Sequence, residues 1–113
     1  MADLLEMTCA CGYRRRVRTG GLMRTWENEA YWPFHCASCG VVDVNIQAPL
    51  ACPSCGATAV SPYGKAPVSL HQDCEFADVQ AWDYTACRHG HLCPACGQHH
   101  LKFSRDRYSV LAD

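Results

Sequence analysis

The stretch "CASCG" at residues 36–40 carries the pattern on which the fold depends, two cysteines separated by two residues and followed directly by glycine. The stretches "CPSCG" at 52–56 and "CPACG" at 93–97 repeat it, and "CACG" at 9–12 is one residue shorter. In a metal knuckle, successive backbone N–H groups point at the thiolate sulfurs, and the next residue is pushed towards positive φ, which glycine adopts without strain. The sequence therefore predicts four metal-binding knuckles.

The composition limits what such a chain can be. With 113 residues there is room for one compact domain or two very small ones, and the ten cysteines supply the extra stabilisation that small domains need. We find no secretory signal and no apolar run long enough to span a membrane, so we expect a cytoplasmic protein whose paired cysteines bind metal. The net charge is −1, so any nucleic-acid binding must depend on a local basic patch.

Zinc favours a closed tetrahedral site, most often four cysteines from two knuckles, and four knuckles therefore predict two Zn²⁺ ions per chain. Taking the knuckles in chain order gives one site in residues 1–47 and one in residues 48–113, with a joint at Ala48–Pro49. The first site is then Cys9, Cys11, Cys36 and Cys39, and the second is Cys52, Cys55, Cys93 and Cys96. The alternative joins the two middle knuckles, which only 12 residues separate, and pairs the terminal knuckles with each other. We expect the sequential arrangement.

The three knuckles with two intervening residues resemble those of the zinc-ribbon superfamily, which includes rubredoxin-like domains and the small ribbons of transcription and translation proteins. The resemblance covers the whole chain as two ribbons, and "CACG" departs from it by one residue. It implies a small all-β, metal-stabilised fold of two tandem zinc ribbons with little helix. It also implies a binding or structural role without naming a partner.

Strand patterns lie between the knuckles. The stretches "YRRRVRT" (13–19) and "VVDVNIQ" (41–47) alternate with period two, which places Val42, Val44 and Ile46 on one side of the second strand. We expect "HLKF" (100–103) and "RYSVL" (107–111) to form a closing hairpin. A turn or two within "TWENEAY" (25–31) is the best candidate for a helix.

The arginines suggest one function. On a strand, Arg14, Arg16 and Arg18 share a face, ~6.6 Å apart, at a spacing that could follow a nucleic-acid backbone. Aromatic residues expected to be exposed lie in the same half, and stacking rings beside guanidinium groups are typical of single-stranded nucleic-acid binding. These aromatic residues are Trp26, Tyr31, Trp32 and Phe34. Alternatively, the arginines only solvate a strand face and protect a sheet edge from aggregation, and the aromatic residues next to Cys36 form a small core over the zinc.

The second half suggests a different function. The acidic and aromatic segment 73–84 suits a basic protein surface, so a protein–protein adaptor is the alternative to nucleic-acid binding. No deaminase or metalloprotease signature occurs, and we do not expect an enzyme. Cys74, Cys87, His89 and His91 remain; we expect buried apolar thiols and surface histidines there, with a third metal site or a redox role less favoured. Four thiolates also suit iron, so zinc is an expectation.

Overall fold

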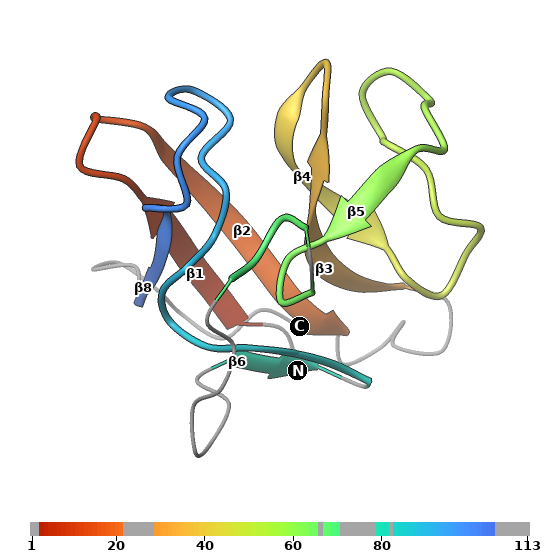
Figure 1. The fold of residues 1–113 in the computed structure, drawn as a ribbon. Coiled ribbons are helices and arrows are strands. Elements are labelled where there is room, and N and C mark those ends of the chain that lie inside the picture. Colours follow the sequence, from red (N-terminus) through yellow and green to blue (C-terminus); the bar gives the residue numbers. More distant parts are fainter. Residues whose placement is uncertain (1–2, 22–28, 66, 71–78, 82, 106–113) are drawn as a thin grey trace.

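The computed structural model describes residues 3–21, 29–65, 67–70, 79–81 and 83–105, and these residues form β-strands and turns without a helix (Figure 1). The expected class, a small all-β fold stabilised by metal and built as two ribbons, is confirmed. The strands are β1 (Asp3–Thr8), β2 (Arg14–Gly21), β3 (Ala30–Cys36), β4 (Gly40–Asn45), β5 (Val60–Pro62), β6 (Val79–Ala81), β7 (Tyr84–Ala86) and β8 (Lys102–Arg105). In this part of the chain no helix is long and apolar enough to cross a membrane.

Two hairpins with an added strand organise the main sheet, whose order is β4-β3-β2-β1-β8, with β5 also paired to β3. We call β3, β4 and β5 the inner unit, and β1, β2 and β8 the outer unit. In each unit the third strand pairs antiparallel with the first strand of the hairpin. The inner unit lies between the two parts of the outer unit along the chain, so the two ribbons are nested, and strand pairs run across the predicted joint at Ala48–Pro49.

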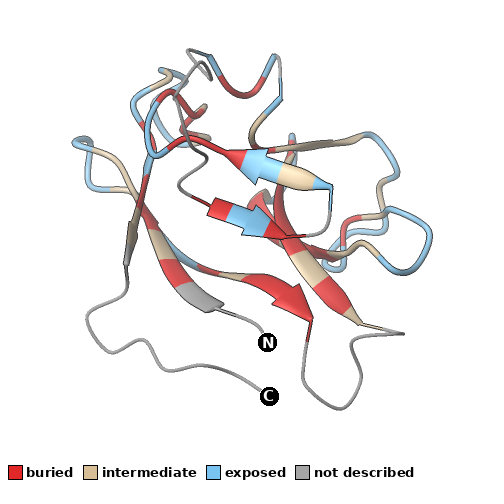
Figure 2. Ribbon diagram, turned by 90° about the horizontal axis from the view of Figure 1, so that it is seen from below, coloured by how far each residue is buried: buried red, intermediate tan, exposed pale blue. Residues whose placement is uncertain are grey.

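The alternation of apolar residues decides which side of each strand is buried. Val17 and Thr19 of β2 are buried whereas Arg14 and Arg16 are exposed; Arg15, which shares the face of Val17, is also exposed, so the alternation begins only at Val17. In β4, Val42 and Val44 are buried on one side, and Val41 is buried on the other side, where Asp43 and Asn45 are half-buried. Figure 2 shows that exposed residues gather mainly in the turns.

The aromatic residues of β3 are part of the core. Trp32 and Phe34 are completely buried, so of the two alternatives for these residues, exposure beside the arginines is wrong and packing in the core is confirmed. Their rings pack against Tyr84 of β7, with centroids 5.6 and 5.8 Å apart. The small β6–β7 sheet therefore covers β3, and burial of these large rings stabilises the contact more than exposure for stacking would.

Tyr63 links the two units through three hydrogen bonds. Its backbone N–H donates to Pro33 O over 3.1 Å, and its carbonyl accepts the indole N–H of Trp32 over 2.8 Å. Its hydroxyl donates to Leu92 O, also over 2.8 Å, next to the last knuckle. The ring is fully buried, and desolvation raises the pKa of the phenol. Tyr63 therefore remains a neutral donor that ties the inner unit to the outer one.

Several expectations concern residues outside the described part of the chain. They are residues 25–28 of the helix candidate 25–31, the exposure of Trp26, residues 107–111 of the closing hairpin, Cys74 and most of the acidic segment 73–84. The rest of that helix candidate is not helical, because Ala30 and Tyr31 begin β3. Of the proposed hairpin, Lys102 and Phe103 begin β8, which pairs with β1. Of the acidic segment, the structure describes Val79–Ala81, which form β6, together with Asp83 and Tyr84, the first residue of β7.

Candidate metal centres and basic face

The four knuckles form two groups of four cysteines, and the sequential grouping predicted above is wrong. The outer group consists of Cys9, Cys11, Cys93 and Cys96, and the inner group consists of Cys36, Cys39, Cys52 and Cys55. Within each group all sulfur atoms lie within 4.8 Å of one another. The reason is topological, because β8 returns to pair with β1 and so brings the last knuckle to the first, while the β3–β4 hairpin reaches the nearby knuckle at 52–55.

The backbone closes the second-half knuckles in the same way. The N–H of Gly56 donates to Cys52 O, and the N–H of Cys52 donates to Ala57 O, each over 2.8 Å. The same pair of bonds recurs at 93–98, from Gly97 to Cys93 and from Cys93 to Gln98. The glycine that follows each of the four cysteine pairs has positive φ, between 74° and 104°, as the cysteine-glycine pattern predicts.

The short first knuckle achieves the same closure with one residue fewer. The N–H of Gly12 donates to Cys9 O over 2.9 Å, and the N–H of Cys9 donates to Tyr13 O over 3.0 Å. Both bonds span one residue less than in the longer knuckles. The single intervening residue therefore keeps the ring of hydrogen bonds and still brings both sulfurs to the outer group.

The sulfur geometry fits a tetrahedral metal. In the outer group, Sγ of Cys9 lies 3.7 Å from Sγ of Cys96, and Sγ of Cys11 lies 3.6 Å from Sγ of Cys93. In the inner group, Cys36 and Cys55 are 3.7 Å apart. A tetrahedral zinc with Zn–S bonds of about 2.3 Å has sulfur–sulfur edges of about 3.8 Å. Both groups could therefore each hold one metal ion with four protein ligands.

Hydrogen bonds prepare the inner sulfurs for metal. Desolvation acts to raise the pKa of Cys52, but the backbone N–H groups of Cys55 and Ser54 donate to its sulfur and bring the pKa down to about 6. Hydrogen bonds with the side chains of Cys52 and Cys55 raise the pKa of Cys39 to about 12. The lowered pKa of Cys52 favours the thiolate form in which a cysteine binds a divalent metal.

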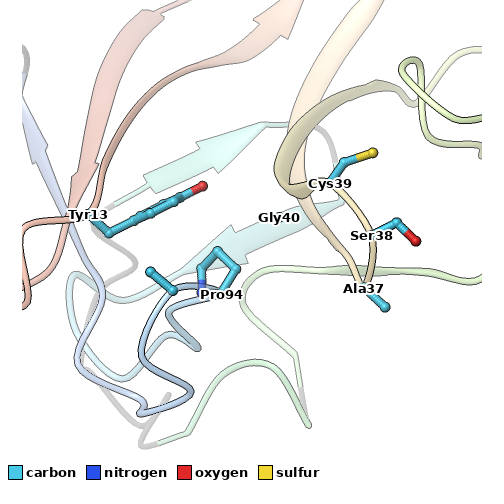
Figure 3. A pocket seen from close by; sticks show the side chains of 7 residues that line it. Tyr13, Ala37, Ser38, Cys39, Gly40 and Pro94 are labelled. Carbon is cyan, nitrogen blue, oxygen red and sulfur yellow. The ribbon is translucent and has the colours of Figure 1, made fainter.

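One knuckle of the inner group and one knuckle of the outer group meet at a shallow pocket of about 250 Å³ (Figure 3). Tyr13 and Pro94, from the outer unit, face the knuckle at residues 37–40 of the inner unit. A Cβ on Gly40 would lie 3.2 Å from both the Pro94 ring and the Tyr13 hydroxyl, which also accepts the N–H of Val41 over 3.4 Å. The pocket is therefore the joint between two knuckles, held together by a tyrosine and a proline.

The three arginines predicted to contact nucleic acid do not have equivalent surroundings. Arg14 and Arg16 are exposed, and Arg14 forms an ion pair of 2.8 Å with Glu6. Arg18 lies between Asp43, at 3.6 Å, and the ring of Tyr31, with the guanidinium carbon 4.0 Å from its centroid. Arg18 therefore joins β2 to β3 and β4, and its cation is already engaged within the protein.

Cys87 and His91 differ from what the sequence predicts. Cys87 is buried but disulfide-bonded, whereas the eight cysteines of the knuckles are free. His91 is fully buried rather than on the surface. A disulfide sulfur is a poor metal ligand, and a third metal centred on Cys87 therefore has no support.

Both ring nitrogens of His91 are occupied. Because a carbonyl can only accept, Nε2–H donates to Cys87 O over 2.7 Å, which leaves Nδ1 to accept the hydroxyl of Ser69 over 2.6 Å. Ser69 in turn accepts the N–H of Gly64 over 2.7 Å. Desolvation lowers the pKa of His91, in agreement with a neutral ring, which also packs against Phe103. His91 is a structural residue of the core.

Sequence reasoning missed two residues that contribute to these sites. Tyr63 looks like one more aromatic residue in a proline-rich stretch, and only the fold shows that it joins the units. Lys102 lies 84 residues from Arg18 in the sequence, and strand pairing brings it to the same sheet. No protein-family model, curated protein or solved structure matches this chain.

Proposed function

We propose that the protein is a recognition module in which two structural zinc ions hold a small β scaffold, and that Arg14 and Arg16 on this scaffold contact nucleic acid. Support for structural zinc comes from the donor set: each group supplies four sulfurs at the separations of a zinc tetrahedron and keeps no position for water or substrate. A closed site stabilises the fold and does not itself perform chemistry, so we propose a binding role rather than an enzyme.

The metal content tests the first part of the proposal. Native mass spectrometry of the full chain, combined with elemental analysis, should give two zinc ions per chain. Iron bound by four thiolates would absorb visible light, whereas zinc has no such absorption. A purified protein that folds with iron, or that folds fully without metal, would contradict the proposal.

The observation that carries the nucleic-acid part is the exposed pair Arg14 and Arg16, which share one face of β2 directly after the first knuckle. Divalent metal surrounded by four thiolates has a formal charge of −2, so loading both sites makes the molecule more acidic than its sequence. Attraction of a phosphate backbone then depends on this local patch, and not on the total charge.

Charge reversal tests this contact. The double variant R14E/R16E should lose binding to a labelled oligonucleotide while it retains two metals and the wild-type melting temperature. Arg18 stays unchanged in this test, because its contacts with Asp43 and Tyr31 stabilise the fold. If binding persists in R14E/R16E, or if the wild type binds no nucleic acid, the protein-docking alternative at residues 73–84 becomes the one to pursue.

A further inference from the structure

The outer surface of the sheet formed by β2, β1 and β8 continues beyond the arginines. Cross-strand partners lie on the same face of a sheet, and Thr8 of β1 pairs with Arg14 on one side and with Lys102 on the other. Glu6 likewise lies between Arg16 and Ser104. The hydroxyls of Thr8 and Ser104 are 3.4 Å apart, as expected for side chains on one face. We call this surface the basic face; it comprises Glu6, Thr8, Arg14, Arg16, Lys102 and Ser104.

Positive charge predominates on the basic face. Arg14, Arg16 and Lys102 are exposed, and Glu6 is the acidic residue among the side chains described there. In the ion pair between Glu6 and Arg14, the Arg14 side chain is 70% exposed and the Glu6 side chain is half-buried, so water and salt screen the attraction. A phosphate group can therefore compete with Glu6 for the Arg14 guanidinium, which binds phosphate at least as readily as carboxylate.

Among the residues that the structure describes, the six side chains of the basic face are cations, hydroxyls and one carboxylate, and the neighbouring ring of Tyr31 is already covered by the Arg18 guanidinium, 4.0 Å from its centroid. Phe103, the aromatic residue of β8, points into the core and is buried, as are Trp32 and Phe34. Proteins that bind single strands stack the unpaired bases on aromatic rings, whereas contacts to phosphate and sugar come from arginine, lysine and small hydroxyl side chains. The chemistry of this face therefore suits a backbone whose bases are already stacked on one another.

The spacing of the cations suits a duplex. Arg14 and Lys102 lie two strands apart, which places their backbones ~10 Å from each other, while Arg14 and Arg16 are ~7 Å apart along one strand. The separation of ~10 Å lies between the widths of the minor groove, ~6 Å, and the major groove, ~12 Å. Long side chains at this spacing can reach phosphates on both sides of one groove.

We propose that Lys102 joins Arg14 and Arg16 in a phosphate-binding face that takes double-stranded nucleic acid through its backbone, without base stacking. This inference rests on the nucleic-acid contact proposed above and adds a third cation, from the opposite end of the chain, and a class of ligand. Because the contacts are to phosphate, binding is independent of sequence and weakens steeply with salt.

Two lysine variants give a matched test. K102A removes a cation from the basic face, and K65A removes one from an exposed lysine that lies outside it, near Tyr84. Anisotropy titrations would use a labelled mixed-sequence duplex of about 20 base pairs and one of its single strands, at several salt concentrations. Native mass spectrometry would confirm that all variants carry the same metals.

We expect the wild type to bind the duplex more tightly than the single strand. The slope of log affinity against log salt should fall in magnitude by about 0.9 in K102A and remain unchanged in K65A. Equal losses in both lysine variants, or no loss in either, would overturn the role of Lys102 while R14E/R16E still tested the arginines. Tighter binding of the wild type to the single strand than to the duplex would overturn the choice of duplex. If the wild type bound a poly-glutamate peptide as tightly as the duplex, the basic face would be a site for acidic polypeptide and the proposal would be overturned.

Discussion

Tyr63 is the single residue whose polar atoms connect most of the structure. Its N–H, carbonyl and hydroxyl each have a partner, and these partners lie in β3 and beside the last knuckle. A buried polar group without a partner costs more than the bond itself contributes, so such a residue has little tolerance for change. The hydroxyl of Tyr63 bonds to Leu92 beside the last knuckle, and its backbone N–H and carbonyl bond to Pro33 and Trp32 of β3.

Replacing Tyr63 by phenylalanine isolates the contribution of the hydroxyl. The ring remains, but the carbonyl of Leu92 loses its donor within the core, which should reduce the free energy of unfolding by about 1–3 kcal/mol. Urea denaturation of the metal-loaded protein measures this change. Tyr84→Phe is the control, because its ring contacts with Trp32 and Phe34 are kept. Equal losses in both variants would show that the Leu92 bond is not responsible.

Gly64 is a position where only glycine fits. A Cβ there would overlap the carbonyl oxygen of Thr85, and φ is +102°. Gly64→Ala should therefore destabilise the fold by about 3 kcal/mol or more, since backbone strain of about 1–2 kcal/mol adds to the cost of overpacking. At Gly56, where φ is +77° and no atom lies within 4 Å of a Cβ, alanine should cost only the strain. Thermal melting measures both alanine variants, and equal decreases in melting temperature would show that overlap with the Thr85 carbonyl does not destabilise Gly64→Ala.

At the scale of elements, the knuckle and the strand that follows act together. Each second knuckle precedes the third strand of its unit, β5 after residues 52–55 and β8 after residues 93–96. Pairing of that strand with the first strand of the hairpin places the second pair of sulfurs opposite the first pair. The pairing of cysteines is thus a consequence of the pairing of strands.

Paired cysteine substitutions test this grouping. The double variant C39S/C55S should lose the inner metal and retain one at full affinity, because both residues belong to the same group. C11S/C39S removes a ligand from each group and should weaken both metals. Native mass spectrometry counts the metals, and the sequential grouping requires the opposite result, with one metal retained in C11S/C39S.

At the scale of the whole molecule, the nested arrangement makes the two sites unequal. The knuckles of the inner site are separated by 12 residues, and those of the outer site by 81, between Cys11 and Cys93. Closing the longer loop costs more chain entropy, at about 0.6 kcal/mol for each doubling of length, which gives about 1.5–2 kcal/mol here. The outer site therefore depends on the folding of the whole chain, and the inner site on a short segment.

Chelator titration should remove the outer metal first. C39S/C55S, which keeps the outer site, should release its metal at a chelator concentration roughly tenfold or more below that needed for C11S/C96S, which keeps the inner site. Loss of the outer metal should also weaken the pairing of β1 with β8. Amide hydrogen exchange should then be faster in β8 than in β4. Simultaneous release of both metals at one concentration would contradict this order.

The sequence predicted the knuckles, the all-β class, the eight cysteines and the exposure of Arg14 and Arg16, because these depend on local patterns of two to five residues. It did not predict the grouping of the cysteines, because four knuckles of almost the same sequence can pair in more than one way. It left the burial of Trp32 and Phe34 open and misplaced His91, because burial of these residues depends on residues distant in the chain, such as Tyr84 and Ser69.

The sequence by itself thus determined which residues can bind metal and where the chain turns, since a thiol pair and the glycine after it act within one turn. The tertiary structure decided which knuckles meet, which cations share a face and which histidine is buried. The physical reason is that strand pairing over long distances, such as β1 with β8, is selected by the burial of the whole core, and no local pattern specifies it.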